Sequence, residues 1–428
     1  MEEDGLKNSA VPLLRTSSQH GIGTATALET LGNIIVSVVG TGILGLPFAF
    51  SVAGWLAGTI GVTISGIATC YCMLLLVQCK EYLASQELTQ ETKTYGDLGY
   101  KSCGNLGRYL TEFLVFMSQC GGAVAYLVFI AQNLSSLYTS HTLTFAAFIF
   151  LLVPVQIALS WITSLSALAP FSIFANVCNV LAVAIVVKED VGEMRAGGFN
   201  ISDRKAIASS MRGLPFAAGM AVFCFEGFGM TLSLEGSMRE KGRFPSLLAK
   251  VFTGITIVYV LFGFSGYMAY GDQTRDIITL NLPQNWSSIP LKIALCLGLI
   301  FTFPIMAHPI HEIVEGKLKN CARFRKFYYS NGGSATISGK CIIYLGRATL
   351  ILALAFLASF VPGFGVFASL VGSTVCALLS FVLPATFHLR LLGSCMHFWQ
   401  RALDYCFLIG GLLFAAYGSY NAVVGVET

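Results

Sequence analysis

The stretch VVGTGILGLP, residues 38–47, places three glycines in the order G-x-G-x-x-G directly after an apolar run. In a dinucleotide-binding fold this pattern cradles a pyrophosphate, and an acidic residue about 20 positions further on binds a ribose hydroxyl. Here Pro47 follows almost at once, and residues 30–79 contain no Asp, Glu, Lys or Arg. The context is wrong for a dinucleotide site, so the glycines need another explanation.

An interrupted membrane helix is such an explanation, because an uncharged run of this length has room for two spans of about 20 residues. Glycine relaxes the backbone and Pro47 removes a hydrogen-bond donor. Non-helical backbone at membrane depth is tolerated only where it lines a cavity or is buried in protein. We therefore expect the segment to turn free backbone groups toward a ligand. Close packing of two helices is the alternative reading of the glycines.

A second stretch of this kind, residues 225–229, has the sequence FEGFG and places Glu226 inside another apolar segment. A carboxylate at the centre of a bilayer costs about 2.5–3.5 kcal/mol on insertion scales, so it usually has a cavity, a partner or a function. Low-dielectric surroundings disfavour the charged form of a carboxyl group. Glu226 is therefore our candidate for proton coupling. The alternative is a structural carboxylate that holds the broken backbone through N–H groups.

The stretch AHPIHEIVE contains the residue types of a metal site in His308, His311, Glu312 and Glu315. Pro309 separates the two histidines, and the group falls at the expected cytosolic end of a span, so a solvated helix end is favoured. An intramembrane enzyme needs a nucleophile with a base, or paired acidic or histidine groups, at one depth. The group lacks an evident partner for such a role. We expect no enzymatic activity, no catalytic residue and no metal.

The composition requires membrane-spanning elements to position these residues. Of the 428 residues, 55% are hydrophobic and only 11% are charged, and the mean hydropathy is +0.72. These values are typical of an integral membrane protein. Uncharged stretches predict eleven spans. They are residues 31–50, 54–79, three within 113–187, 213–236, 251–270, 293–311, two within 348–389, and 405–424.

The distribution of positive charge predicts the orientation. With the N-terminus in the cytosol, 19 of the 26 Lys and Arg fall on cytosolic segments and 7 on the other side. Residues 1–30 then form a cytosolic tail. Inner loops that face anionic lipid explain the formal charge of +4, so we expect the lipid bilayer and not nucleic acid as a partner. The sequence contains no targeting signal that decides between the vacuolar and the plasma membrane, and it does not predict an oligomeric state.

The two interrupted segments lie five spans apart, as in transporters built from inverted repeats. Such transporters hold substrate near the midplane, between one broken helix from each half. We therefore divide the transporter domain, residues 31–424, into a first repeat, a second repeat and an additional helix. Their expected bounds are 31–187, 213–389 and 405–424.

Five short motifs in the right order resemble the amino acid/auxin permease family. They are GTGILGLP at 40–47, TYGDLG at 94–99 running to Gly107-Arg108, YLVFIAQNL at 126–134, FEG at 225–227 with Leu234-Glu235, and VGS at 371–373 leading to Leu383-Pro384 and His388-Leu389. The likeness covers nearly the whole chain. Among subfamilies, it looks most like the plant aromatic and neutral amino acid transporters.

This resemblance implies an all-α, leucine-transporter-like fold with a 5+5 inverted repeat and one added helix. It also implies coupled transport of amino acids, with H⁺ as the expected coupling ion and no cofactor. Broken half-helices attract a carboxylate through free N–H groups and the helix dipole, while exposed carbonyls suit an ammonium. Free amino acids are therefore the expected substrates, with auxin-like aromatic carboxylates as weaker ones. A passive channel is the remaining alternative, although a pore more naturally shows rings of charge or a repeated filter.

The expected substrate site has two walls. The first wall is formed by Gly40, Thr41, Gly42, Ile43, Leu44 and Gly45, and the opposing wall by Phe225, Glu226, Gly227 and Phe228. Glu226 is the only charged member, and several members are large and apolar. The sequence therefore predicts a preference for neutral amino acids, including aromatic ones.

Overall fold

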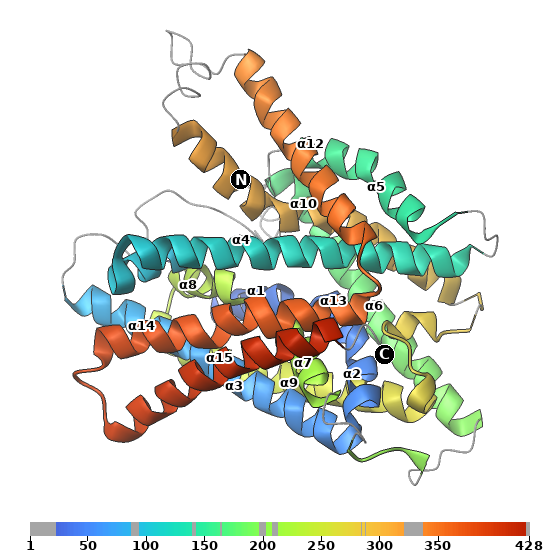
Figure 1. Cartoon of the computed structure of the whole chain (residues 1–428), viewed down its shortest axis with the longest axis horizontal. Coiled ribbons are helices and arrows are strands. Elements are labelled where there is room, and N and C mark those ends of the chain that lie inside the picture. Colours follow the sequence, from blue (N-terminus) through green and yellow to red (C-terminus); the bar gives the residue numbers. More distant parts are fainter. Residues whose placement is uncertain are drawn as a thin grey trace, which may run out of the picture.

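The computed structural model describes residues 23–86, 94–138, 143–162, 165–196, 203–207, 213–283, 285–286, 288–320 and 337–424. Within these ranges the chain is almost entirely helical (Figure 1). The helices in chain order are α1 Ala27–Val38, η1 Thr41–Gly45, α2 Leu46–Ala53, α3 Trp55–Ser85, α4 Tyr95–Leu137, α5 Phe145–Ser160, α6 Leu165–Ala196, α7 Gly213–Cys224, α8 Phe228–Ser237, η3 Lys241–Arg243, α9 Phe244–Tyr270, η4 Gly271–Gln273, η5 Ile278–Leu280, α10 Ser288–Asn320, α12 Ile337–Ser359, α13 Phe364–Val371, η6 Gly372–Cys376, η7 Leu378–Val382, α14 Leu383–Leu392 and α15 Phe398–Val424.

Long apolar helices account for the expected spans. In the described ranges, nine helical segments are long and apolar enough to cross a membrane, and α1 with η1 and α2 makes a tenth that is bent by 45°. The shorter apolar helix α5, with 16 residues, occupies the position of the fourth expected span. The expected all-α membrane protein of about eleven spans is confirmed.

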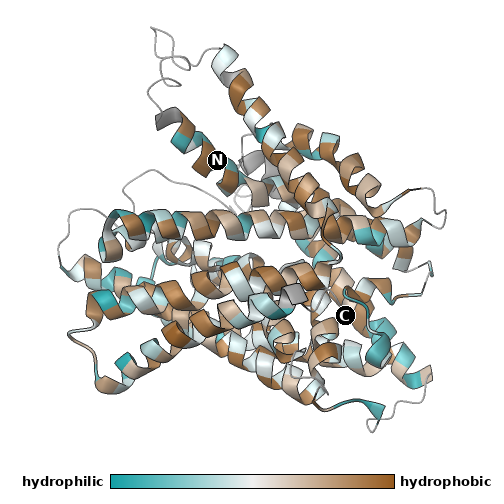
Figure 2. Ribbon diagram, in the orientation of Figure 1, coloured by the Kyte–Doolittle hydropathy of each residue, from teal (hydrophilic) through white to brown (hydrophobic). Residues whose placement is uncertain are grey.

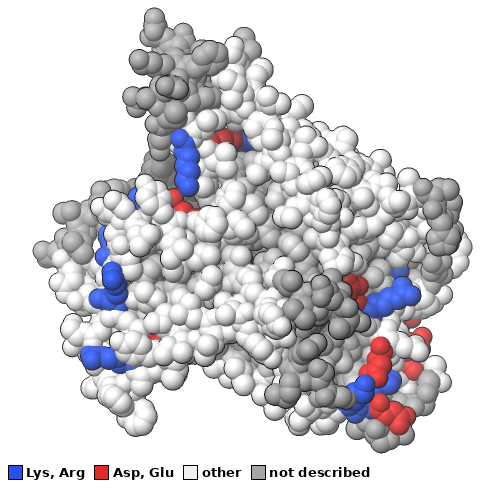
Figure 3. Space-filling model, in the orientation of Figure 1, with Lys and Arg blue, Asp and Glu red and all other residues white. Residues whose placement is uncertain are grey.

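Hydropathy and charge are arranged as a bilayer requires. Apolar residues dominate the middle of the long helices (Figure 2). Charged side chains gather toward the helix ends, and the band between them is nearly free of charge on the face shown in Figure 3. Because a lone charge is costly in hydrocarbon, this band marks the depth of the membrane.

Helices from the two expected repeats pack against one another. Helix α3 packs on α9, α2 lies between α7 and α9, and α10 packs on α6 and α4. In Figure 1 the long helix α4 runs across the molecule, with α5, α10 and α12 to one side of it. The broken helices α1–α2 and α7–α8 are thus enclosed by longer helices that position them.

Local signals set several helix ends. Helix α1 begins at Ala27, within the segment assigned to the tail, because Thr26 and Glu29 form a capping box there. Residues 1–22 of that segment lie outside the described residues. Helix α6 continues to Ala196, beyond the expected end at residue 187. A membrane helix does not stop where charged residues begin, because its charged end extends past the hydrocarbon.

The last helix, α15, is fixed to the bundle by a buried polar network. Asp404 is fully buried, and its carboxylate lies 2.6 Å from Nδ1 of His388 on α14. The Tyr71 hydroxyl of α3 donates to the same carboxylate at 3.1 Å. The Tyr71 ring also stacks on Phe407 at 5.2 Å between centroids. These contacts place α15 against α3 and α14, outside the broken helices.

Candidate functional site: two broken helices

The first interruption separates α1 from η1. Val39 and Gly40 are extended, with φ/ψ of −81°/99° and −119°/−164°. The chain then forms a short 3₁₀ turn and enters α2, where Pro47 lies in the first turn. Proline is tolerated there because the first N–H groups of a helix lack intrahelical partners. The sequence thus ends one helix and starts another in the middle of a span.

The second interruption separates α7 from α8. Phe225, Glu226 and Gly227 lie outside both helices. The Glu226 N–H donates to the carbonyl of Phe223 at 3.3 Å, so the last turn of α7 tightens before the chain leaves the helix. Gly227 then leads into α8. The two interruptions predicted from glycine, proline and glutamate are therefore present at the expected positions.

Tyr259 of α9 joins the two breaks. Its hydroxyl lies 3.3 Å from the carbonyl oxygen of Val38 and 3.2 Å from that of Cys224. Val38 is the last residue of α1, and Cys224 is the last residue of α7. The carbonyl groups in the last turn of a helix have no hydrogen-bond donor within that helix. The tyrosine is fully buried. One side chain therefore provides a donor for two broken ends at a depth where water is absent.

The two breaks also touch directly at Gly42. A Cβ atom on Gly42 would lie 3.1 Å from Sγ and 3.3 Å from Cα of Cys224, and 3.5 Å from the ring of Phe223. Gly45 is equally crowded, because a Cβ there would lie 3.0 Å from the Phe364 ring. By contrast, a Cβ on Gly40 would meet nothing within 4 Å. The glycines at 42 and 45 therefore permit close approach, so the packing reading and the broken-helix reading both hold.

Glu226 faces uncharged groups from two other elements. Its carboxyl lies near Ser118 on α4 and Cys376 of η6. Ser118 and Cys376 also lie 4.0 Å apart, measured between Oγ and Sγ. The single carboxylate of the site is thus placed between the break, α4 and the π-helical turn η6. Turns of this kind occur frequently at functional sites.

Comparison with known proteins identifies the family of this arrangement. Residues 23–424 match the family described as transmembrane amino acid transporter protein. The chain belongs to this family. It is 60% identical to the amino acid transporter ANT1 of Arabidopsis thaliana over 98% of each chain. It is 36% identical to the amino acid transporter AVT3B of the same plant, over 100% of this chain and 99% of the relative.

The transporter also shares its fold with a solved structure of distant sequence. The inward-facing conformation of Mhp1 aligns with 94% of this chain and 89% of its own, with 10% sequence identity and a TM-score of 0.57. The likeness confirms the leucine-transporter-like fold expected from the sequence.

The expected site residues divide between the space at the break and the surrounding core. Gly42 and Glu226 lie where the two halves meet. The Phe225 ring instead packs on α9, at 5.0 Å from Tyr259 and 6.1 Å from Phe252 between centroids. The remaining expected members are Gly40 and Gly227, which form backbone at the breaks, and Thr41, Ile43, Leu44, Gly45 and Phe228, which are buried within or beside them.

Sequence reasoning missed the side chains that face Gly42. These are Phe223 and Cys224, which precede the expected motif. The Phe223 ring is 6.3 Å from Phe364 of α13, and Phe364 is 5.6 Å from Phe129 of α4. The rings of Phe223 and Phe364 therefore lie beside Gly42 and Gly45, while the Phe225 ring packs against α9.

On the side expected to face outward, the segment between α9 and α10 packs on the first broken helix. Asp276 in this segment accepts from Nε2 of Gln132 at 3.0 Å and from the Gly365 amide at 3.4 Å. Gln132 in turn accepts from the Phe364 amide at 3.2 Å. Both amides belong to the first turn of α13, where N–H groups need partners. Because η5 also contacts η1, these contacts, named the outer clamp from the expected orientation, tie the segment to the first break.

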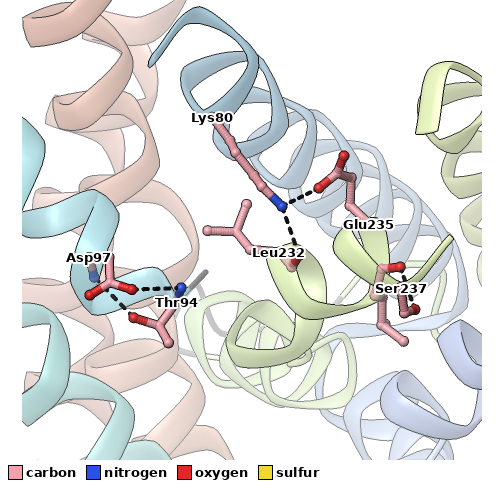
Figure 4. A network of polar contacts seen from close by, with 7 residues as sticks. Lys80, Thr94, Asp97, Leu232, Glu235 and Ser237 are labelled. Carbon is pink, nitrogen blue, oxygen red and sulfur yellow. Dashed lines mark hydrogen bonds and ion pairs between the residues drawn. The ribbon is translucent and has the colours of Figure 1, made fainter. Parts of the chain in front are cut away.

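On the side expected to face the cytosol, Lys80 of α3 pairs with Glu235 of α8, and it donates to the Leu232 carbonyl at 3.2 Å (Figure 4). The segment before α1 adds two backbone bonds. The Ala25 amide donates to Ser237 at 3.0 Å, and the Arg239 amide donates to Ala25 at 3.0 Å. These inner contacts tie the start of α1 to the end of α8, so the two broken helices are held together on this side as well.

The site is closed in this conformation. A small pocket beside the second break is lined by residues that include Val38, Met73, Gly227 and Thr231. Its volume of about 10 Å³ is enough for about one water molecule. This pocket is too small to hold an amino acid.

The histidine group is not the solvated helix end that the sequence favoured. His311 is buried, and Glu315 accepts from Nε of Arg347 on α12 at 2.7 Å. Arg347 also donates to the Ser160 carbonyl of α5 at 2.7 Å. The expectation was wrong because α10, α12 and α5 pack together at this depth. In the described part of the chain, no group of three or more His, Cys, Asp or Glu is placed to hold a metal ion.

Proposed function

We propose that this member of the family is a secondary active transporter of neutral and aromatic amino acids that works by alternating access and is coupled to protons. The observation that carries the proposal is the contact of the two breaks at Gly42 and Cys224, with Tyr259 bound to both helix ends. The two breaks bring the ends of α1, η1 and α7 close to one point. That arrangement suits the ammonium and carboxylate shared by all α-amino acids.

Alternating access requires that each side open in turn. The outer clamp at Asp276 joins α4, α13 and the segment before α10, and the inner contacts at Lys80 and Ala25 join α1, α3 and α8. Each set consists of a few polar contacts rather than a broad apolar interface. Release of one set while the other persists exposes the site to one side at a time.

Glu226 is the proposed proton carrier. Its carboxyl lies between the second break, α4 and η6, beside uncharged partners. Protonation at this point changes how the break contacts the rest of the bundle, so it favours one conformation over another. We further propose a cytosolic N-terminus and a location in the vacuolar or the plasma membrane. Symport from an acidic vacuole then drives export into the cytosol, and symport at the plasma membrane drives uptake.

A competition panel tests the substrate class. Because the ring of Phe223 faces Gly42 and lies near the ring of Phe364, neutral amino acids are expected to compete better than aspartate or glutamate. An apolar lining discriminates by only about 1–3 kcal/mol per methylene, so selectivity among neutral side chains is expected to be broad. Auxin-like aromatic carboxylates are included as expected weaker competitors. Inhibition of labelled uptake in liposomes is measured for each compound, and strongest inhibition by acidic amino acids would withdraw this assignment.

A further inference from the structure

A second buried carboxylate lies between α6 and α9, away from both breaks. Asp190 of α6 has no exposed side-chain surface. Its Oδ2 lies 3.5 Å from the Ser265 hydroxyl of α9, which is a long contact. Its Oδ1 is sealed from solvent and has no hydrogen-bond partner. Burial of an ionised carboxylate with so little compensation is strongly unfavourable.

The hydroxyl of Tyr270 is also buried without a hydrogen-bond partner. Tyr270 is the last residue of α9, and its hydroxyl oxygen is sealed from solvent and has no hydrogen-bond partner. It lies within electrostatic reach of Asp190 and of the neighbouring Glu189 and Glu193. Asp190 and Tyr270 therefore each leave a buried polar atom without a hydrogen bond, on two helices that pack together. A buried carboxylate oxygen without a hydrogen-bond donor makes the charged form of the group unfavourable, so the neutral acid is favoured at Asp190.

The charged groups near Asp190 are exposed or have other partners. On α6, Glu189 lies 3.5 Å from Lys188, and Glu193 is exposed. From the elements packed against α6, α9 presents only Ser265 and Tyr270 to this carboxylate. The nearby cations have other partners: Arg204 donates to the Met268 carbonyl at 3.1 Å, Lys205 pairs with Asp272 at 3.1 Å, and Lys292 of α10 donates to Ser136 at 3.3 Å.

We propose that Asp190, with Ser265 and Tyr270, forms a proton-binding site on the non-cytosolic side of the transporter, separate from Glu226. The proton adds to Oδ1 of the Asp190 carboxylate, which makes a neutral acid and removes the buried charge. No other ion is needed for charge balance. The proposal rests on the proton-coupled transport proposed above, and it adds a second group that responds to the pH of the outer compartment.

The position of α9 gives this site an effect on transport. Helix α9 packs against α2, the continuation of the first broken helix, as well as against α6. A Cβ on Gly263 would lie 2.5 Å from the Phe50 ring, and one on Gly266 would lie 2.7 Å from Pro47. When Asp190 loses its proton, the charge requires water, which separates α6 from α9. Movement of α9 then changes how α9 packs against α2.

Infrared difference spectroscopy of purified protein during a pH titration tests proton binding without any transport assay. The titration is made in the Glu226→Gln background, so that Glu226 does not contribute. We expect a protonated carboxyl band that disappears at high pH, is absent in Asp190→Asn, and shifts in Tyr270→Phe. Glu193→Gln is the matched control, because it removes an exposed carboxylate three residues along the same helix and is expected to leave the band unchanged. A band of unaltered size in Asp190→Asn would overturn the proposal.

A transport measurement with controlled sidedness gives the second readout. In a chain with no other substitution, Asp190→Asn is expected to exchange amino acids. Its exchange rate is expected to change by less than about twofold as the outer pH changes over about pH 5–8. If Asp190→Asn retains the wild-type pH dependence, the proposal is wrong even where exchange is normal. If the wild type exchanges no amino acid at all, the proposed function fails, whereas the infrared result still decides whether Asp190 binds a proton. Size-exclusion profiles and membrane insertion of each variant confirm that its fold is intact.

Discussion

Gly42→Val is expected to abolish amino acid exchange while leaving membrane insertion largely intact. Even the Cβ of alanine would lie 3.1 Å from Sγ and 3.3 Å from Cα of Cys224. Valine adds two methyl groups and restricts the backbone further, so the breaks must move apart. Misplacement of a binding wall by about 1 Å can cost about 100-fold in rate, and we expect at least this loss. Initial exchange rates in liposomes, normalised to inserted protein, provide the measurement.

Matched substitutions separate packing at the site from general damage to α1. A Cβ on Gly40 or on Gly32 would meet nothing within 4 Å. Gly32→Ala is therefore expected to keep wild-type exchange, and Gly40→Ala to lose little. Gly42→Ala is expected to fall between the controls and valine. Wild-type exchange by normally inserted Gly42→Val would contradict the placement of substrate between the two breaks.

Glu226→Gln is expected to keep amino acid exchange but lose accumulation driven by a pH gradient. Glutamine preserves shape and hydrogen bonding toward the neutral partners Ser118 and Cys376, but it cannot titrate. In one-to-one symport, a gradient of about one pH unit supports at most about tenfold accumulation. In Glu226→Gln, the ratio of internal to external substrate is expected to fall to about one. Accumulation of labelled substrate is measured with and without the pH gradient.

Glu81→Gln, at the exposed inner end of α3, is the control for removal of a negative charge. It is expected to accumulate substrate like the wild type. The structural alternative for Glu226, a carboxylate that permanently holds the broken backbone, predicts reduced exchange in Glu226→Gln with the accumulation ratio of the remaining activity unchanged. Retained pH-driven accumulation would therefore eliminate Glu226 as the required proton carrier.

The positions of the broken helices could be predicted because they depend on local chemistry. Gly40, Gly42 and Pro47 interrupt one apolar run, and Glu226 with Gly227 interrupts another, so composition alone marks both breaks. The spans could be predicted for a similar reason, since a membrane helix must be long and apolar. Helix ends were less accurate, as α6 shows, because charged residues extend a helix beyond the hydrocarbon.

The side chains that meet across the site could not be predicted in the same way. Tyr259 is one of many aromatic residues in a long apolar helix, and nothing in its neighbourhood indicates bonds to Val38 and Cys224. Phe225 was assigned to the site and Phe223 was not, because helical spacing no longer gives side-chain direction once a helix has ended. The partner of Glu235 is Lys80, 155 positions away in the chain, a pairing that depends on how α3 and α8 pack.

Counterflow of a labelled neutral amino acid into liposomes that contain the purified protein is the most direct test of the central claim. A carrier with one substrate site between two broken helices exchanges internal unlabelled for external labelled substrate. We predict transient, saturable accumulation of label that is lost when the internal amino acid is omitted and is inhibited by other neutral amino acids. Label entry that never saturates and is accompanied by ionic conductance, or no entry in the presence of correctly inserted protein, would contradict the account.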